Sequence, residues 1–202
     1  DISVTKLPEN IGFAPANNIG IDQAINDGND YIFTLNNDTD LEKDCILNTV
    51  NFINGRNNKK EFYQLFIMNY FERDVCDCAG MKIDDYLIPS QLGFKEKVSD
   101  KIKSIDKIDG VCAGAAFYSS TSLKELRAKY GYYFDETFVS YYEDVDISLR
   151  IKKTGNVPIF ISNAIVYHVH SATGNKISGF KEYHLARNLF IYTRKNQSKE
   201  EY

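Results

Sequence analysis

The sequence lacks the features that mark several large classes of protein. Only four of its 202 residues are cysteines, which are too few for a disulfide-stabilised scaffold. The closest pair, Cys76 and Cys78, has neither a second pair nor nearby histidines, as a zinc site would require. The most apolar stretches, Phe62–Met68 and Val157–Ile161, are far shorter than the roughly 18 residues of a membrane-spanning helix. We therefore expect free thiols and no membrane span.

The charge balance excludes another class of protein. Lysine and arginine number 24 against 28 aspartates and glutamates, a formal net charge of −4 at pH 7. Without a basic excess, broad binding to nucleic acid is not expected. Hydrophobic residues make up 43% of the chain, and this composition and length suit a single globular domain over residues 1–202. Because the chain begins at Asp1, we expect it to be a piece of a larger protein.

Apolar periodicity predicts strands that alternate with helices, which is typical of an α/β sheet layered with helices. No clear period is visible over residues 72–107. The predicted strands cover residues 2–7, 31–35, 62–71, 111–118, 157–161 and 164–168, and the predicted helices cover residues 16–26, 41–54, 121–130, 143–153 and 180–195.

A polar segment follows the predicted strand at residues 31–35. It contains Asn36, Asp38 and Asp40 at a spacing of two, at the carboxyl end of a strand, where α/β sheets bind ligands. Carboxylates of this kind suit Mg²⁺ or Mn²⁺ with a diphosphate. Alternatively, the acids cap the helix expected from Leu41. The spacing leaves both interpretations open for Asp38 and favours capping for Asp40. A calcium loop is excluded because Leu41 replaces its required glycine.

A second acidic group, Glu143 and Asp144, opens the helix predicted at residues 143–153. An ionised aspartate can serve as a general base. The local pattern alone favours a simpler interpretation, since acidic residues are common in the first turn of a helix. Asp146 and Arg150 are four residues apart, so we expect an ordinary helical ion pair.

The sequence contains three histidines. His168 and His170 are predicted to lie on the same face of a strand, because side chains alternate with a period of two. This spacing indicates a metal ligand only weakly. His184 falls inside the closing helix, where we expect a structural role.

Taken together, the residues of these segments and their order along the chain resemble the inverting family 2 glycosyltransferases with the A-type nucleotide-sugar fold. The bacterial rhamnosyltransferase-like branch is the most similar. Among the matching stretches are Asn36-Asn-Asp38, Glu143-Asp144, Val166-Tyr-His168 and Arg187-Asn188. The resemblance covers most of the chain, in residues 9–21, 31–39, 109–115, 134–150, 166–173 and 183–188.

The resemblance implies a Rossmann-like α/β/α fold and a role for each matched residue. Asp38 would coordinate Mg²⁺ or Mn²⁺, with His168 completing the metal shell. Asp144 would be the catalytic base, and Glu143 beside it would orient the acceptor. The residues implied to approach the nucleotide-sugar are Asn10, Asn18, Asn36 and Arg187, although packing is an equally open interpretation for Arg187.

The implied reaction is metal-dependent transfer of a sugar from a nucleotide-sugar donor to a hydroxyl of a glycan or lipid-linked acceptor, with inversion. This chemistry belongs to cell-surface polysaccharide synthesis in the cytoplasm, where a lipid-linked acceptor would bring the protein to the inner face of the membrane. Two alternatives remain open. One is a non-catalytic module that binds nucleotide or carbohydrate, and the other is a glycoside hydrolase with two carboxylates.

The sequence departs from the family at its start. Members of the family open with a strand–helix–strand unit, and residues 2–7 match a later strand, so the fold is expected to be N-terminally incomplete. That unit lies at the centre of the family's sheet. We therefore expect exposed apolar faces, an open sheet edge, and little or no transferase activity from this chain alone.

Overall fold

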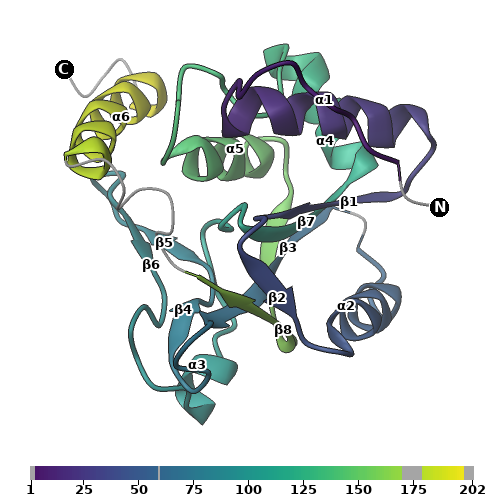
Figure 1. The fold of residues 1–202 in the computed structure, drawn as a ribbon, viewed down its shortest axis with the longest axis vertical. Helices are drawn as coiled ribbons and strands as arrows, with labels where there is room; N and C mark the ends of the chain where they lie inside the picture. The colour runs from purple at the N-terminus through teal and green to yellow at the C-terminus, as the bar shows by residue number, and fades with distance from the viewer. Residues whose placement is uncertain (1–2, 59, 170–178, 198–202) are drawn as a thin grey trace.

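The chain forms a mixed α/β structure with helices on both faces of a central sheet, as the sequence predicts (Figure 1). It was obtained as a computed structural model, which describes residues 3–58, 60–169 and 179–197. The strands are β1 (Tyr31–Leu35), β2 (Thr39–Leu41), β3 (Glu61–Asn69), β4 (Cys76–Cys78), β5 (Met81–Ile83), β6 (Pro89–Gln91), β7 (Ala115–Ser119) and β8 (Val157–His168). The helices are α1 (Phe13–Asn26), α2 (Cys45–Asn54), α3 (Asp100–Lys103), α4 (Ser120–Tyr130), α5 (Glu143–Lys152) and α6 (Phe180–Asn196).

The topology of the sheet gathers several loops at one edge. The strand order is β1-β7-β3-β8-β2, and β4 pairs with β3. β7 runs antiparallel to β1 and β3, β3 runs parallel to β8, and β2 runs antiparallel to β8. β1, β3 and β8 therefore end at the same edge of the sheet, and β2 and β7 begin there. This edge is where a ligand site is expected in an α/β sheet.

Each face of the sheet carries its own apolar core. Because side chains alternate along a strand, β3 sends Phe62 and Phe66 to one face and Tyr63 and Leu65 to the other. Residues of α1, α4 and α5 cover the first face, and residues of α2 cover the second. The nearly continuous apolar stretch of β3 is thus explained by burial on both faces.

The strand expected at residues 2–7 is wrong for the residues that the structure describes. Residues 3–7 form no strand, and the side chain of Val4 is 82% exposed. The segment has the alternating pattern of a strand but no hydrogen-bonded neighbour within the described ranges. An alternating pattern alone does not stabilise a strand.

The helix expected from Leu41 is also displaced, because Leu41 ends strand β2. Pairing with β8 holds residues 39–41 extended, and α2 begins at residue 45. The capping role expected for Asp40 is therefore wrong. Its carboxylate lies 3.1 Å from Nη2 of Arg73, and Asp44 occupies the position before α2.

Other boundaries also differ from the predictions, and strand β3 covers residues 61–69 rather than 62–71. The two strands expected at residues 157–161 and 164–168 are one strand, β8, whose pairing with β3 shifts register between Leu65 and Phe66. Strand β7 begins at residue 115 rather than 111, because residues 112–114 form a turn. Helix α1 begins three residues early, since its first turn tolerates Pro15. Residues 72–107 hold β4, β5, β6 and α3, which at three or four residues are too short to show a period.

The sheet has an open edge at β1, in agreement with the expectation. Among the described strands, β1 pairs with β7 alone. The carbonyl of Asp30 and the N–H of Asn36 hydrogen-bond toward β7. By alternation, the peptide groups of Tyr31, Phe33 and Leu35 face the open side. A groove of about 530 Å³ lies between this strand and α1.

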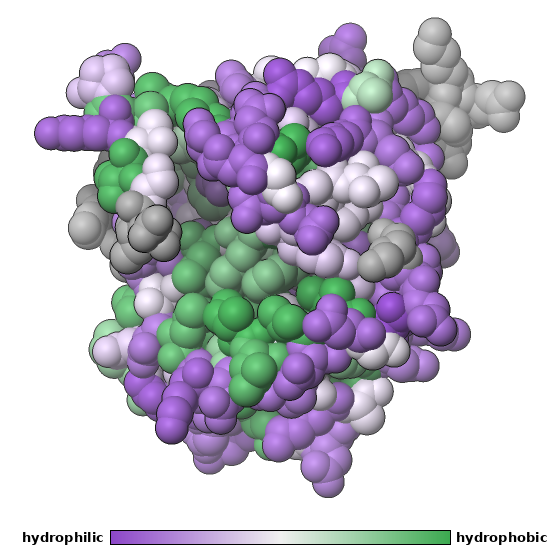
Figure 2. All heavy atoms as spheres, turned by 90° about the vertical axis from the view of Figure 1, so that its right-hand side faces the viewer, coloured by the Kyte–Doolittle hydropathy of each residue, from purple (hydrophilic) through white to green (hydrophobic). Residues whose placement is uncertain are grey.

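Apolar side chains are also exposed on α2, which lies at the right of Figure 1. Ile46, Leu47 and Val50 are 42%, 58% and 42% exposed. Figure 2 looks onto this side of the molecule and shows apolar side chains gathered across its middle, between hydrophilic ones.

Within the described ranges, no helix has the length and apolarity that crossing a membrane requires.

Candidate functional site

The turn after β1 places the first candidate residues at the ligand-binding edge of the sheet. Oγ1 of Thr39 donates a 2.6 Å hydrogen bond to the carbonyl of Asn36, and the N–H of Val169 donates to the carbonyl of Asp38 at 2.9 Å. Asp38 therefore lies in a connection between two strands. Because no helix begins beside it, the capping interpretation of Asp38 is excluded.

His168, the last residue of β8, lies against this turn. Its Nε2 is 3.3 Å from Oδ1 of Asp38 and 3.3 Å from Nδ2 of Asn36. The side chains of Asp38 and His168 are 26% and 16% exposed. The structure thus brings His168 into contact with two residues, Asn36 and Asp38, that lie more than 100 positions earlier in the sequence. His170 lies outside the described residues.

A second carboxylate contacts the other side of the imidazole. Oδ2 of Asp77, in β4, is 3.3 Å from Nδ1 of His168, and its side chain is only 5% exposed. Sequence analysis missed this residue. Its only local signal is a polar residue between two buried cysteines, Cys76 and Cys78, which is typical of many edge strands.

The Asp38–His168 pair fits a divalent cation. No group of three or more metal-ligating side chains occurs in the part of the chain that the structure describes. The 3.3 Å between the Nε2 and Oδ1 atoms is close to the ~3 Å that separates neighbouring ligands around an octahedral ion bound at 2.0–2.1 Å. Mg²⁺ commonly uses one or two protein carboxylates together with water and phosphate oxygens. Asp38 and His168 could therefore hold Mg²⁺ or Mn²⁺.

The turn at residues 112–114 forms the next wall of the site. Oε1 of the fully buried Gln64 accepts a 2.6 Å hydrogen bond from the N–H of Cys112, and its Nε2 donates to the carbonyl of Ala115 at 3.2 Å. The N–H of Asn36 donates to the carbonyl of Gly114 at 3.0 Å. A Cβ atom at Gly114 would lie only 3.3 Å from Nδ2 of Asn36. A glycine here thus allows the two loops to pack closely.

Asp144 reaches the same turn from the first turn of α5. Its Oδ1 accepts a 2.9 Å hydrogen bond from the N–H of Val145, and its carboxylate lies near the N–H of Ala113 and the thiol of Cys112, both of which oppose the rise in its pKa that burial causes. The turn at 112–114 therefore contacts Asp144 on one side and Asn36 on the other. Asp38, His168 and Asp144 thus lie around one edge of the sheet.

Glu143 and Asp144 differ in how their charges are stabilised. Oε2 of Glu143 is buried and has no hydrogen-bond partner among the described residues. Burial, reinforced by the negative charge of Asp144, raises the pKa of Glu143 to about 8. Burial also raises the pKa of Asp144, but the N–H groups of Val145 and Ala113 oppose that rise. Burial therefore favours a protonated Glu143 at neutral pH, whereas main-chain N–H groups favour the charged form of Asp144.

The approach to α5 is held in an unusual backbone conformation. Tyr141 and Tyr142 have φ angles of 68° and 72°, in the left-handed region that side chains disfavour by roughly 1–2 kcal/mol per residue. The fully buried Asn188 of α6 stabilises this segment. Its Nδ2 donates hydrogen bonds to the carbonyls of Ser140 at 2.7 Å and Tyr141 at 2.9 Å. A residue of α6 thus fixes the direction from which α5 and Asp144 enter the site.

Arg187 supports the same segment. Its Nη1 donates to the carbonyl of Thr137 at 3.0 Å and to Oδ1 of Asn188 at 2.6 Å. The structure therefore shows a packing role for this side chain. Contact of Arg187 with a diphosphate stays a prediction.

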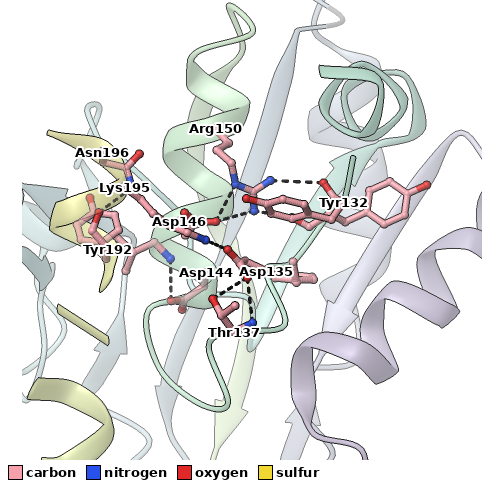
Figure 3. A network of polar contacts seen from close by, with 12 residues as sticks. Tyr132, Asp135, Thr137, Asp144, Asp146, Arg150, Tyr192, Lys195 and Asn196 are labelled. Carbon is pink, nitrogen blue, oxygen red and sulfur yellow. Dashed lines mark hydrogen bonds and ion pairs between the residues drawn. The ribbon is translucent and has the colours of Figure 1, made fainter. Parts of the chain in front are cut away.

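A buried ionic network lies behind Asp144 (Figure 3). The expected pair of Asp146 and Arg150 is confirmed, with 2.7 Å between carboxylate and guanidinium. It is not an ordinary surface pair, because the side chains are only 2% and 4% exposed. Lys195 of α6 forms an ion pair with Asp135. Figure 3 shows α5, α6 and the segment before α5 joined by these contacts.

The remaining candidate residues also hold loops. Oδ1 of Asn18 accepts from the N–H of Phe134 at 2.9 Å, and its Nδ2 donates to the carbonyl of the same residue. Oδ1 of Asn10 accepts from the N–H of Gly12 at 3.0 Å. His184 is 8% exposed and its ring lies 4.3 Å from that of Phe180, as expected for a structural residue. Nucleotide contact by Asn10 and Asn18 stays a prediction.

Comparison with known proteins shows the fold. The sequence matches no known protein family, and no curated protein matches it. In structure it is similar to the crystal structure of GalNAc-T7 with UDP, GalNAc and Mn²⁺, with a TM-score of 0.59 and 15% sequence identity. The match covers 85% of this chain and 32% of that one, so the chain spans about a third of its neighbour's length. The chain has the A-type fold of nucleotide-sugar glycosyltransferases.

Proposed function

We propose that this chain carries the catalytic residues of a glycosyltransferase that moves a sugar from a nucleotide-sugar to a hydroxyl group. The observation that carries the proposal is the meeting of Asp38, His168 and Asp144 at one edge of the sheet. It combines a pair of cation ligands with a carboxylate suited to base catalysis. The presence of UDP, GalNAc and Mn²⁺ in the crystal structure of GalNAc-T7 supports the same class of chemistry.

In the proposed reaction, Asp144 accepts the proton of the acceptor hydroxyl as its oxygen attacks the anomeric carbon. Glu143 retains its own proton at neutral pH, so it can donate a hydrogen bond that orients the acceptor. A bound Mg²⁺ or Mn²⁺ supplies positive charge for the departing nucleoside diphosphate. Asp38 and His168 would hold that ion. A single displacement inverts the configuration of the sugar.

The acceptor is proposed to bind beside residues 72–107. A cavity of about 240 Å³ opens there, and one of its lining residues, Asp77, also contacts His168. The cavity is lined by Asn69, Glu72, Val75, Asp77, Phe94 and Lys95.

The same proposal includes membership of family 2 and similarity to its rhamnosyltransferase-like branch. It also includes a glycan or lipid-linked acceptor of cell-surface polysaccharide.

A second candidate function is a binding module that keeps the fold without the reaction. The open edge of β1 and its 530 Å³ groove favour it, because an unpaired strand leaves the sheet beside the site without support. We infer that the isolated chain transfers sugar slowly or not at all. Robust transfer by this chain alone would overturn that inference.

Metal-dependent nucleotide binding tests the proposal. We expect the chain to bind UDP in calorimetry with Mn²⁺ and much more weakly with EDTA. Asp38→Ala should abolish the Mn²⁺-dependent part, because it removes the only charged ligand of the pair. Asp40→Ala is the matched control, since Asp40 faces solvent and Arg73. Equal binding of UDP with and without Mn²⁺, or by the Asp38 variant, would contradict the proposed site. Hydrolysis of an oligosaccharide without nucleotide would instead indicate a glycoside hydrolase.

A further inference from the structure

Asp77 is a buried carboxylate that the proposed reaction does not use. Its side chain is 5% exposed, and its Oδ2 lies 3.3 Å from Nδ1 of His168. The opposite ring nitrogen, Nε2, faces Oδ1 of Asp38 and Nδ2 of Asn36, each at 3.3 Å. The imidazole is therefore placed between two carboxylates that come from β4 and from the β1–β2 turn.

This arrangement determines which ring nitrogen of a neutral imidazole carries the proton. An ionised carboxylate only accepts hydrogen bonds, so Asp77 favours the proton on Nδ1, while Asp38, at the same distance, favours it on Nε2. The amide N–H of Asn36 also faces Nε2 and donates to its lone pair, which shifts the balance toward the proton on Nδ1. Two electron-rich atoms, Nε2 and Oδ1, face each other at 3.3 Å, an arrangement that a cation bound to both would stabilise.

We propose that Asp77 is a positioning residue that holds His168 in the tautomer and orientation required to bind a divalent cation. The proposal rests on the cation site of the proposed function. Ligating histidines commonly donate their second N–H to a carboxylate, which fixes the ring and makes the ligand more basic. Asp77 meets this requirement from inside the protein, and β4 fixes its backbone by pairing with Ile67 and Met68 of β3.

The sharpest perturbation is Asp77→Asn, because it preserves the shape of the side chain while introducing a donor. An amide N–H directed at Nδ1 favours the proton on Nε2, and a protonated Nε2 cannot bind a metal. Outer-shell changes of this kind typically weaken metal binding by about 10–100-fold. Asp40→Asn makes the same chemical change on an exposed carboxylate beside Arg73, and we expect it to change the affinity less than about twofold.

Two measurements test the proposal on the full chain. The first titrates the wild type, Asp77→Asn and Asp40→Asn with MnCl₂ and follows free Mn²⁺ by electron paramagnetic resonance, with circular dichroism as a check of folding. The second records ¹⁵N chemical shifts of the His168 ring in metal-free protein, at a pH where the ring is neutral. We expect the proton on Nδ1 in the wild type and on Nε2 in Asp77→Asn.

The outcomes separate this inference from the proposed function. If the wild type binds Mn²⁺ and Asp77→Asn binds equally well, the positioning role is wrong and the cation site stands. If the wild type does not bind Mn²⁺, the cation site fails and this inference fails with it. Should Asp77→Asn not fold, the wild-type tautomer still decides, because a proton on Nε2 overturns the positioning role.

Discussion

Replacing Asn188 by alanine should destabilise the chain and disturb the candidate base at once. The Asn188 side chain donates two hydrogen bonds to main-chain carbonyls before α5, at 2.7 and 2.9 Å, and is fully buried. Each bond contributes about 1 kcal/mol net, and leaving the two part-buried carbonyls without a donor adds at most the roughly 1–3 kcal/mol of a fully buried one. We therefore expect Asn188→Ala to lower the free energy of unfolding by about 2–4 kcal/mol.

The expected effect on the site follows from the backbone that these bonds hold. Without them, the left-handed Tyr141 and Tyr142 lose the contacts that offset their conformational strain, and the first turn of α5 can shift Asp144. Urea unfolding followed by circular dichroism at 222 nm measures the loss of stability. Asn196→Ala is the matched control on the same helix, because its Nδ2 bonds the carbonyl of Tyr192 one turn back and its Oδ1 accepts only an exposed hydrogen bond from Nζ of Lys153. A loss below about 1 kcal/mol for Asn188→Ala, or an equal loss for the control, would refute the reasoning.

Three further predictions concern charge and surface. The folded chain keeps a proton on Glu143 between its ordinary pKa of 4.5 and its folded pKa of about 8, so stability falls as pH rises through this window. Glu143→Gln should reduce that fall in urea unfolding at pH 5 and pH 8, leaving only the smaller contribution of Asp144, and unchanged pH dependence would contradict the prediction. Arg150→Met leaves the carboxylate of Asp146 buried without its partner and should lower the free energy of unfolding by roughly 3–5 kcal/mol. Adding Asp146→Leu should recover part of this loss, because it removes the unpaired charge. No recovery in the double variant would argue against a paired charge. An open strand edge and exposed apolar side chains favour self-association, so we expect the chain to associate in sedimentation velocity. Lysine at both Leu35 and Leu47, which are 38% and 58% exposed, should reduce that association, and an unchanged or absent association would contradict the prediction.

Local sequence patterns predicted the parts of the site that depend on a single element. Five consecutive strand-forming residues define β1, so the position of Asn36 and Asp38 at its carboxyl end follows directly. Helix α5 is defined as clearly, with acidic residues at its start and a glycine after its end. In both cases the signal lies within about ten residues of the functional side chain.

The contacts that sequence analysis missed join distant segments. Asp77 lies in a strand of three residues, which is too short to show a period of two. Pairing with β8 makes residues 39–41 a strand where a helix was predicted to start. This pairing was not predicted because β8 is more than 120 residues away in sequence. The bond between Asn188 and Ser140 spans 48 residues. Tertiary pairing decides each of these cases, and no propensity of the local residues encodes it.

The turn at residues 112–114 explains how the two parts of the candidate site keep their geometry. The N–H of Asn36 donates to the carbonyl of Gly114, and the N–H of Ala113 lies near the carboxylate of Asp144 and helps to stabilise its charge. Gln64, fully buried in the central strand β3, hydrogen-bonds both ends of the turn, at the N–H of Cys112 and the carbonyl of Ala115. A displacement of the turn would therefore move the metal-binding and base-bearing segments together. It follows that the distance between them is set by the packing of β3 and β7 in the core, rather than by the loops that carry the reactive groups.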